Sequence, residues 1–484
     1  MPELDLNIIN NVFVSVGGNK LRLAKIYFDS TIKSIQFLSE PFDWEDIETL
    51  EKRNAFLSRS KFDNNINSNS VDGQFNLLMP GAIDSHVHFN TPGFEQREDF
   101  QHASNAAAFG GVTTIVDMPC TSIPPVTSVS NLKTKLETLK GKSVIDYALW
   151  GGISRNDLGN NTAVHKNITE LSEAGVVGFK AYLISGMKTF KDLNNDQMKI
   201  VAQYVKDTGK LLGVHAEDKF LVESRRLRFQ ETSRNTWRQY CLSRDVLAEE
   251  KAVKEMIDIA STTGVKTHIV HLSSKIALDL IRNAQNKGIP ISSETCPHYL
   301  YFTQDNFLNP EISNFLKTAP PVKFEEDKLA LWNGLADGTL SFVVSDHAGS
   351  IPEIDKSSEN FWEVYGGIPG VEHRVPFLFS EGFIKNKVTL EQTINLLSTN
   401  TANHFGIKNK GSLQLGYDAD FALINLWDKE IISAKNMHSK GWHTPFEGEI
   451  FNATVEKTWL RGNIIADRSN EIKTFYEGNF IPVN

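Results

Sequence analysis

Eight short apolar runs, each followed by a stretch with the periodicity of an amphipathic helix, recur along most of this chain. We interpret the runs as buried parallel strands, because a strand that is covered on both faces is continuously apolar rather than alternating. Strands that alternate with helices form a parallel sheet, and eight of them indicate an α/β fold closed into a (β/α)8 TIM-like barrel. The predicted strands are residues 77–84, 112–118, 144–150, 176–183, 210–216, 266–272, 289–295 and 341–346.

The two ends of the chain have a different pattern. Residues 1–76 and 411–484 contain short runs of alternating apolar and polar residues, interrupted by Gly, Asn and Asp. This pattern is typical of short strands joined by turns. We therefore expect a small β-rich domain built from residues 1–76 and 411–484, and a barrel domain that spans residues 77–410.

Composition argues against several classes of partner and against an oxidising compartment. The chain has 50 Lys+Arg and 59 Asp+Glu, a formal net charge of −9, and it lacks the basic clusters that bind nucleic acids or anionic membranes. No run approaches the ~18 consecutive apolar residues of a membrane helix. Three cysteines without a CxxC pair favour a reducing compartment, and the first residues do not resemble a signal peptide. We expect a cytoplasmic protein that binds neither nucleic acid nor a membrane.

Polar side chains that are unusual in buried strands fall at or near the carboxyl ends of the predicted strands. In a (β/α)8 barrel these ends share one rim, which is where active sites are built. Side chains that are far apart in the sequence would therefore face a single pocket. The residues concerned are His86 and His88 at the first strand, Lys180 in the fourth, His215 and His271 at the fifth and sixth, and Asp346 at the eighth.

The histidines and Asp346 point to a metal site. Side chains alternate with period two along a strand, so His86 and His88 lie on the same side and both could bind one ion. An unpaired carboxylate at the end of an apolar run is costly to bury, so Asp346 needs a cation or several donors. Beside a divalent ion it could also accept the proton of an attacking water. Each residue taken alone has a structural alternative: a hydrogen-bonded core histidine, or an aspartate in a helix cap or salt bridge.

Lys180 lies inside the apolar run VVGFKAYL. A buried ammonium group must lose its charge, form an ion pair or be modified. A neutral lysine amine can take up carbon dioxide to form a carbamate, whose two oxygens could hold two metal ions together. The alternative is a salt-bridged lysine in a strand.

The motifs around these residues resemble the amidohydrolase superfamily, specifically its cyclic-amide branch of allantoinases, dihydroorotases and hydantoinases or dihydropyrimidinases. The resemblance implies two divalent ions, zinc in the first place and manganese, iron or cobalt as alternatives. It implies His86, His88, Lys180, His215, His271 and Asp346 as metal ligands, with Lys180 carboxylated and Asp346 catalytic. It also implies a homo-oligomer, a dimer or a tetramer. The motifs are MPGAIDSHVHFNTPG (79–93), GGVTTIVDMP (110–119), GVVGFKAYL (175–183), VHAED (214–218), HIVHLSS (268–274), SSETCPHYL (292–300), TAPPVK (318–323), SDHAG (345–349) and GYDADFALI (416–424).

Within this branch the chain is most similar to allantoinases. Dihydroorotases usually carry an Arg that binds the substrate carboxylate at the position of Asn90, and the segments MPCTSIPP, ALWGGIS and YGGIPGVEHRVPFLFSEG are allantoinase-like. The resemblance therefore implies hydrolysis of a five-membered cyclic ureide, allantoin to allantoate, in purine catabolism. The alternatives are hydantoinase, dihydropyrimidinase or dihydroorotase activity, or a catalytically silent scaffold of the same fold.

Two further residues near the predicted rim have open interpretations. We predict that Asn90 contacts polar atoms of the substrate; the alternative is a turn-forming Asn before Thr91-Pro92-Gly93. Cys120 is predicted to be an inert thiol in the pocket wall or the core, since hydrolysis at a metal centre requires no cysteine nucleophile.

Overall fold

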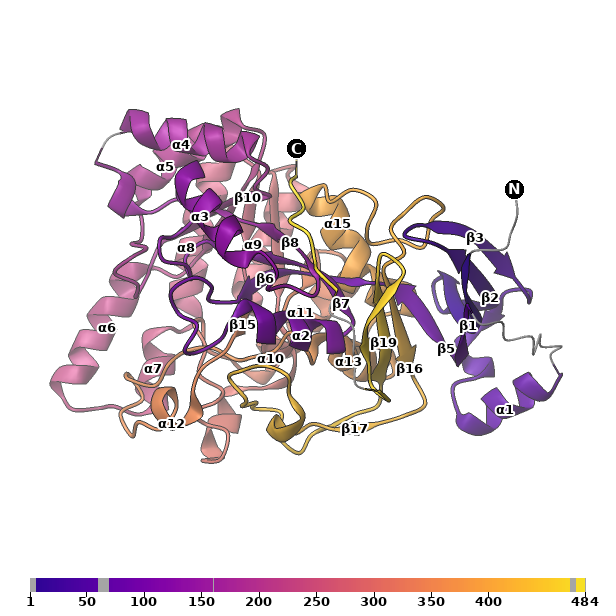
Figure 1. Ribbon diagram of the computed structural model, residues 1–484. Coiled ribbons are helices and arrows are strands. Elements are labelled where there is room, and N and C mark those ends of the chain that lie inside the picture. The colour runs from indigo at the N-terminus through magenta and orange to yellow at the C-terminus, as the bar shows by residue number, and fades with distance from the viewer. Residues whose placement is uncertain (1–5, 60–68, 160, 471–475, 484) are drawn as a thin grey trace.

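The computed structural model describes residues 6–59, 69–159, 161–470 and 476–483. Its larger part is a ring of parallel strands with helices outside it (Figure 1). The strands of the ring are almost entirely buried, which explains why they are continuously apolar in the sequence. They are β6 (Ala82–His88), β7 (Val112–Asp117), β8 (Asp146–Leu149), β9 (Gly151–Gly152), β10 (Gly178–Tyr182), β11 (Leu211–His215), β12 (Thr267–Ile269), β13 (Ile291–Thr295), β14 (Phe342–Val343) and β15 (His347–Ala348).

Strand pairing follows the chain around the ring. Strand β6 pairs with β7 and β7 with β8, and a second series of pairs runs from β9 to β14, all parallel. Strand β15 pairs with β6, where the ring began. Only Trp150 separates β8 from β9, and a short link separates β14 from β15, so each of these pairs is one passage of the chain. The predicted (β/α)8 fold is confirmed.

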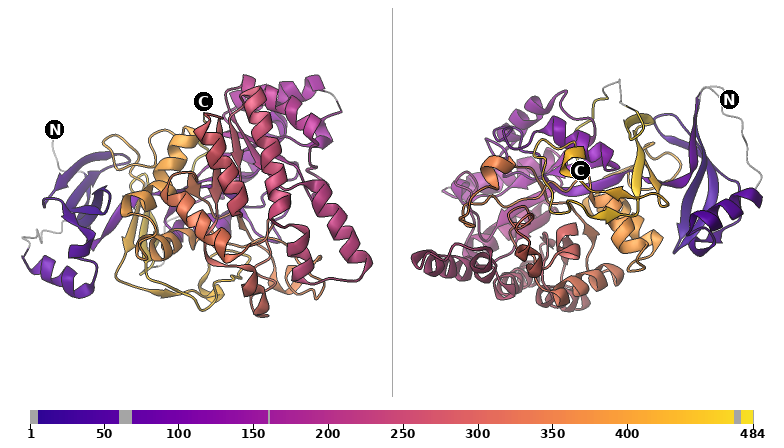
Figure 2. Two further views of the ribbon diagram at one scale, coloured as in Figure 1. Left: turned by 180° about the vertical axis from the view of Figure 1, so that it is seen from behind. Right: turned by 90° about the horizontal axis from the view of Figure 1, so that it is seen from below.

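Helices follow most barrel strands and cover the outside of the ring. Seen from behind, the helices of residues 246–336, in red and orange tones, stand side by side on the outer face (Figure 2). Capping residues define their ends: the Asp245 side chain accepts hydrogen bonds from the first turn of α8, and Gly264, at φ +75°, ends that helix. The helices are α2 (Phe100–Phe109), α3 (Val129–Leu139), α4 (Asn161–Glu173), α5 (Asn195–Asp207), α6 (Lys219–Glu231), α7 (Trp237–Ser243), α8 (Val246–Thr263), α9 (Lys275–Asn286), α10 (Pro297–Tyr301), α11 (Glu325–Ala336), α12 (Pro352–Asp355), α13 (Arg374–Phe377), α14 (Leu390–Ile394) and α15 (Asn400–Phe405).

Two barrel strands are shorter than the sequence predicts. Strand β12 ends at Ile269 and β14 ends at Val343, whereas the apolar runs continue to residues 272 and 346. The reason is the backbone of His271 and Asp346, whose φ angles are 39° and 49°. This left-handed region is incompatible with a strand, and residues other than glycine that adopt it concentrate at functional sites.

A second sheet lies beside the barrel and contains strands from both chain ends. Its order is β20-β19-β16-β5-β1-β2-β3, with β4 also paired to β2. Strands β16 and β19 lie between the barrel and the N-terminal strands (Figure 1). The rings of Phe28 and Phe421, from opposite ends of the chain, pack with centroids 5.3 Å apart. The strands are β1 (Asn7–Gly17), β2 (Lys20–Phe28), β3 (Ile32–Phe37), β4 (Phe42–Asp43), β5 (Ser70–Pro80), β16 (Phe421–Asn425), β19 (Thr454–Leu460) and β20 (Asn463–Asp467); α1 (Leu50–Arg59) precedes β5, and β17 (Glu430–Ile431) pairs with β18 (Ile450–Phe451).

The first predicted barrel strand, residues 77–84, divides between the two sheets. Its first part ends β5 in the second sheet, and its last part begins β6 in the barrel. Gly81 stands at the junction, where a Cβ atom would lie 2.2 Å from Oγ1 of Thr113. The absence of a side chain there lets the chain pass directly from one sheet to the other. The division into two domains at residues 76 and 411 stays a prediction.

The end of the chain covers the barrel on the side opposite to the carboxyl ends of its strands. The backbone N–H groups of Gly478 and Ile481 donate to the carbonyls of Ser143 and Tyr147, at 2.8 Å in both cases. Val483 N–H donates in the same way to Gly175. Within the described ranges, none of the helices is both long enough and apolar enough to cross a membrane.

Candidate metal centre and active site

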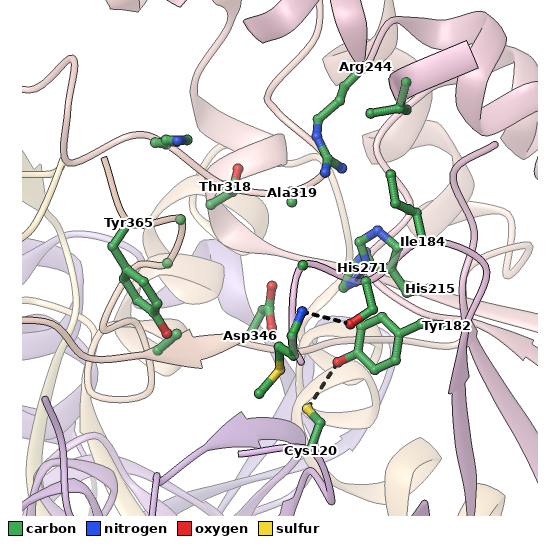
Figure 3. Close-up of a pocket in the computed structure, with 18 of the residues that line it drawn as sticks. Cys120, Tyr182, Ile184, His215, Arg244, His271, Thr318, Ala319, Asp346 and Tyr365 are labelled. Carbon is green, nitrogen blue, oxygen red and sulfur yellow. Dashed lines mark hydrogen bonds between the residues drawn. The ribbon is translucent and has the colours of Figure 1, made fainter. Parts of the chain in front are cut away.

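The carboxyl ends of the barrel strands surround a cavity of about 590 Å³. Five of the six predicted metal ligands contribute to its lining, and Figure 3 shows three of them, His215, His271 and Asp346, together. They come from four different strand ends, so the cavity exists only because the barrel brings those ends to one rim. The five are His86, His88, His215, His271 and Asp346.

His86, His88 and Asp346 form one group of potential ligands. The Nε2 atoms of His86 and His88 lie 3.2 and 3.3 Å from the same oxygen, Oδ1 of Asp346. The two imidazoles are adjacent because their residues are two apart in β6, with ring centroids separated by 5.4 Å. One nitrogen or oxygen atom from each residue lies within 4.8 Å of the others, a separation that a single metal ion could span.

His215 and His271 form a second group beside the first. Nδ1 of His215 lies 3.0 Å from Nε2 of His271. The rings of His271 and His86 are 5.3 Å apart between centroids, so the two groups adjoin. Burial lowers the pKa values of His215 and His271, which favours the neutral imidazoles that bind metals.

Two of the four imidazoles, those of His86 and His215, are oriented by a carboxylate on one ring nitrogen. Oε1 of Glu294 lies 2.5 Å from Nδ1 of His86, and Oε2 of Glu217 lies 2.8 Å from Nε2 of His215. A carboxylate can only accept, so the proton of each ring lies on that nitrogen and the other nitrogen presents its lone pair to the centre. Burial alone would raise the pKa of Glu294, but the adjacent His86 and His268 hold it well below its usual range.

Lys180, in β10, is fully buried, and its charge interacts with His215, His271 and Asp346. Its Nζ atom has no hydrogen-bond partner, and it forms no ion pair with any residue that the structure describes. The salt-bridged alternative therefore does not apply to the described residues. Burial lowers the pKa of Lys180 to about 8, against the opposing charge of Glu294. A fraction of neutral amine, which is the form that reacts with carbon dioxide, therefore exists near neutral pH.

These donors fit divalent metal ions. Imidazole nitrogens, a buried carboxylate and a lysine amine without a hydrogen-bond partner among the described residues are a coherent ligand set. Nitrogen and oxygen donors of this kind accept zinc, manganese, iron or cobalt. A second cluster of carboxylates, Asp146, Asp418 and Asp420, does not fit a metal in the same way. Nζ of Lys410 lies 2.6 to 3.0 Å from an oxygen of each of them and already supplies the cation.

The two other residues predicted near the rim, Asn90 and Cys120, lie in different surroundings. Asn90 is buried at φ 60°, its carbonyl accepts a hydrogen bond from the N–H of Phe94 at 3.0 Å, and it is not among the described residues that line the cavity. This geometry favours the turn alternative, and a substrate contact by Asn90 stays a prediction. Cys120 lies in the cavity wall, with Sγ 3.1 Å from the hydroxyl of Tyr182 (Figure 3).

Sequence reasoning missed three charged residues that support the site. Glu217 and Glu294 orient imidazoles, and Arg244 forms an ion pair with Glu217. A signal for Glu294 was present, since it lies in the predicted buried strand 289–295, where a carboxylate requires a partner, as Asp346 does. For Arg244, which follows α7, the sequence contains no such signal, because the ion pair joins segments that the fold alone brings together.

Comparison with known proteins identifies the family. Residues 77–465 match the family model of the amidohydrolase family, which is most of the chain. The chain belongs to the amidohydrolase family. The predicted resemblance is thereby confirmed.

Curated relatives of this amidohydrolase include allantoinases. It is 34% identical over 396 residues to the allantoinase of Rubrobacter xylanophilus, a match that covers 82% of this chain and 85% of the relative. It is 32% identical over 420 residues to the allantoinase of Bacillus licheniformis, covering 85% and 90%. Among solved structures, the L-hydantoinase (dihydropyrimidinase) from Arthrobacter aurescens is similar at a TM-score of 0.87, with 25% identity and coverage of 99% and 100%.

We expect the variant Glu294→Gln to weaken metal binding about 10- to 100-fold, the usual cost of losing a carboxylate that orients a ligand histidine. The amide can accept a hydrogen bond from His86, but it lacks the negative charge that holds the ring proton on Nδ1. Competition with a chromophoric chelator measures the affinity. Glu249→Gln is the matched control, because Glu249 is also buried but bonds to Ser273 and to none of the predicted ligands. Equal affinities for the two variants would contradict the orienting role.

Proposed function

We propose that this amidohydrolase opens the ring of allantoin to give allantoate, at a centre of two divalent metal ions, zinc in the first place. The observation that carries the proposal is the convergence of two imidazole pairs and Asp346 at the barrel rim, with a buried Lys180 that has no hydrogen-bond partner among the described residues. The curated allantoinases, which this chain matches over more than 80% of its length, support the choice of substrate.

We assign the ligands from their grouping. His86 and His88 would hold one ion, and His215 and His271 the other, with Asp346 beside the first pair. A carboxylated Lys180 would bridge the two. When bound, the ions would lower the pKa of a water molecule and polarise the carbonyl of the scissile amide.

Asp346 is the proposed proton carrier. Burial alone would raise its pKa, but His86 and His88 hold it well below the usual range, so the carboxylate is ionised at neutral pH. It would take the proton of the attacking water and deliver it to the departing ring nitrogen. A C–O bond forms, the ring C–N bond breaks, and the product is an open-chain carboxylic acid. The constrained backbone at Asp346 keeps the carboxylate between the two imidazoles.

A substrate panel tests this function. We expect kcat/KM for allantoin to exceed the values for hydantoin, dihydrouracil and dihydroorotate, each measured with metal analysis of the same sample. A higher kcat/KM for one of the other rings would mean that this ring, and not allantoin, is the preferred substrate. A fully metal-loaded sample without turnover of any ring would favour the silent scaffold.

Two further parts of the proposal concern the cell and the assembly. The described cysteines, Cys120, Cys241 and Cys296, are all free and buried, which supports a reducing compartment such as the cytoplasm. We also propose a homodimer or homotetramer, on the resemblance to the cyclic-amide branch.

A further inference from the structure

Arg244 occupies the wall of the cavity next to the metal ligands. It directly follows α7, and its guanidinium points into the cavity, toward the side where His271 and His215 lie (Figure 3). The side chain is 17% exposed, so the group is largely removed from bulk water. Any substrate bound at the metal ligands would therefore lie beside a cation in a poorly solvated space.

One edge of this guanidinium is anchored and the other is free. Its Nη1 donates to Oε2 of Glu217, the carboxylate that also bonds to His215. Burial opposes the charge of Arg244, but Glu217 raises its pKa, so the group stays cationic. Neither Nε nor Nη2 has an acceptor in the described part of the chain. The anchored edge thus holds the plane of the guanidinium while the remaining donors are available to a ligand.

Two neighbouring polar groups of the cavity wall, Lys317 and Tyr240, are already satisfied within the protein. Nζ of Lys317 donates to the carbonyls of Phe361 and Val364, at 2.6 and 2.5 Å. The hydroxyl of Tyr240 donates to the carbonyl of Thr318 at 2.8 Å. Arg244 differs from Lys317 and Tyr240 because two of its nitrogens, Nε and Nη2, have no acceptor among the described residues.

We propose that Arg244 determines specificity by binding the carbonyl oxygen of a ureido substituent on the ring, so that the enzyme prefers allantoin to the unsubstituted hydantoin ring. This inference rests on the proposed function. The reacting amide must lie at the metal ligands, so the substituent is the part of the substrate that is left to contact the wall. A buried N–H donor that has no acceptor costs binding free energy, so the unsubstituted hydantoin ring binds less tightly than allantoin.

The test compares two substrates in two variants. Arg244→Lys keeps a cation beside Glu217 but lacks the planar fork of donors. We expect its kcat/KM for allantoin to fall about tenfold or more, the effect of one hydrogen bond to a charged group, while the value for hydantoin changes about twofold at most. Arg238→Lys is the matched control, because Arg238 is exposed on α7 and lies outside the cavity lining. It should leave both values unchanged.

The metal content of Arg244→Lys shows whether Arg244 determines specificity or only supports the metal ligands. If Arg244 acts only through Glu217 and His215, Arg244→Lys lowers kcat/KM equally for both substrates and loses metal. That result overturns the inference. An unchanged ratio of the two kcat/KM values at full metal content overturns it as well. Failure of the proposed function is a different result, visible in the wild-type enzyme: a preference for dihydroorotate would mean that the guanidinium binds a carboxylate instead.

Discussion

Asp346→Asn is expected to reduce kcat for allantoin by about 10²- to 10⁴-fold, the range that general acid–base catalysis contributes. The amide has nearly the same shape as the carboxylate and can still contact a metal ion through Oδ1. It cannot accept a proton from water at neutral pH, and it cannot deliver one to the leaving nitrogen. The expected result is therefore a folded enzyme that retains part of its metal and has lost most of its turnover.

Steady-state kinetics and metal analysis on the same preparation measure this effect. Asp337→Asn is a suitable control, because Asp337 follows α11, pairs with Arg282 and does not line the cavity. Near-normal turnover by Asp346→Asn would refute the proposed proton transfer. A loss that is fully explained by missing metal would assign Asp346 to metal binding alone.

Lys180→Ala should lose most of its metal and, with it, nearly all activity. The side chain is buried in β10, where its charge interacts with His215, His271 and Asp346, and its carbamate would supply the anionic bridge between the two ions. Alanine leaves a space of lysine size at that position. A short carboxylic acid such as acetate or propionate could enter this space and provide two oxygens, so we expect partial recovery of metal and activity when it is added.

Lys135→Ala is the matched control for this experiment. Lys135 is equally buried, but it forms an ion pair with Asp117 and a hydrogen bond of 2.8 Å to Ser122. Breaking a buried ion pair costs about 3–5 kcal/mol, so this variant should unfold more easily without any rescue by carboxylic acids. Unchanged metal content in Lys180→Ala would disprove the bridging carbamate. Mass spectrometry of the intact wild-type protein checks for the added carbon dioxide directly.

Local pattern predicted much of the barrel, for a physical reason. A strand buried on both faces is continuously apolar, so the positions of β7, β8, β10, β11 and β13 were readable from the sequence within a few residues. The ends of β12 and β14 were not readable, because the left-handed backbone of His271 and Asp346 depends on contacts across the barrel. The junction at Gly81 was missed for a different reason, because apolar residues continue across both sheets.

The sequence alone determined which side chains could bind a metal, because His86 and His88 alternate in one strand and because a histidine, lysine or aspartate within an apolar run needs a special partner. Tertiary structure alone decided how they are used. The pairing of Glu294 with His86 and of Arg244 with Glu217 joins residues from separate elements. Their distances depend on how the strands close into a ring, and a local pattern contains no information about that closure.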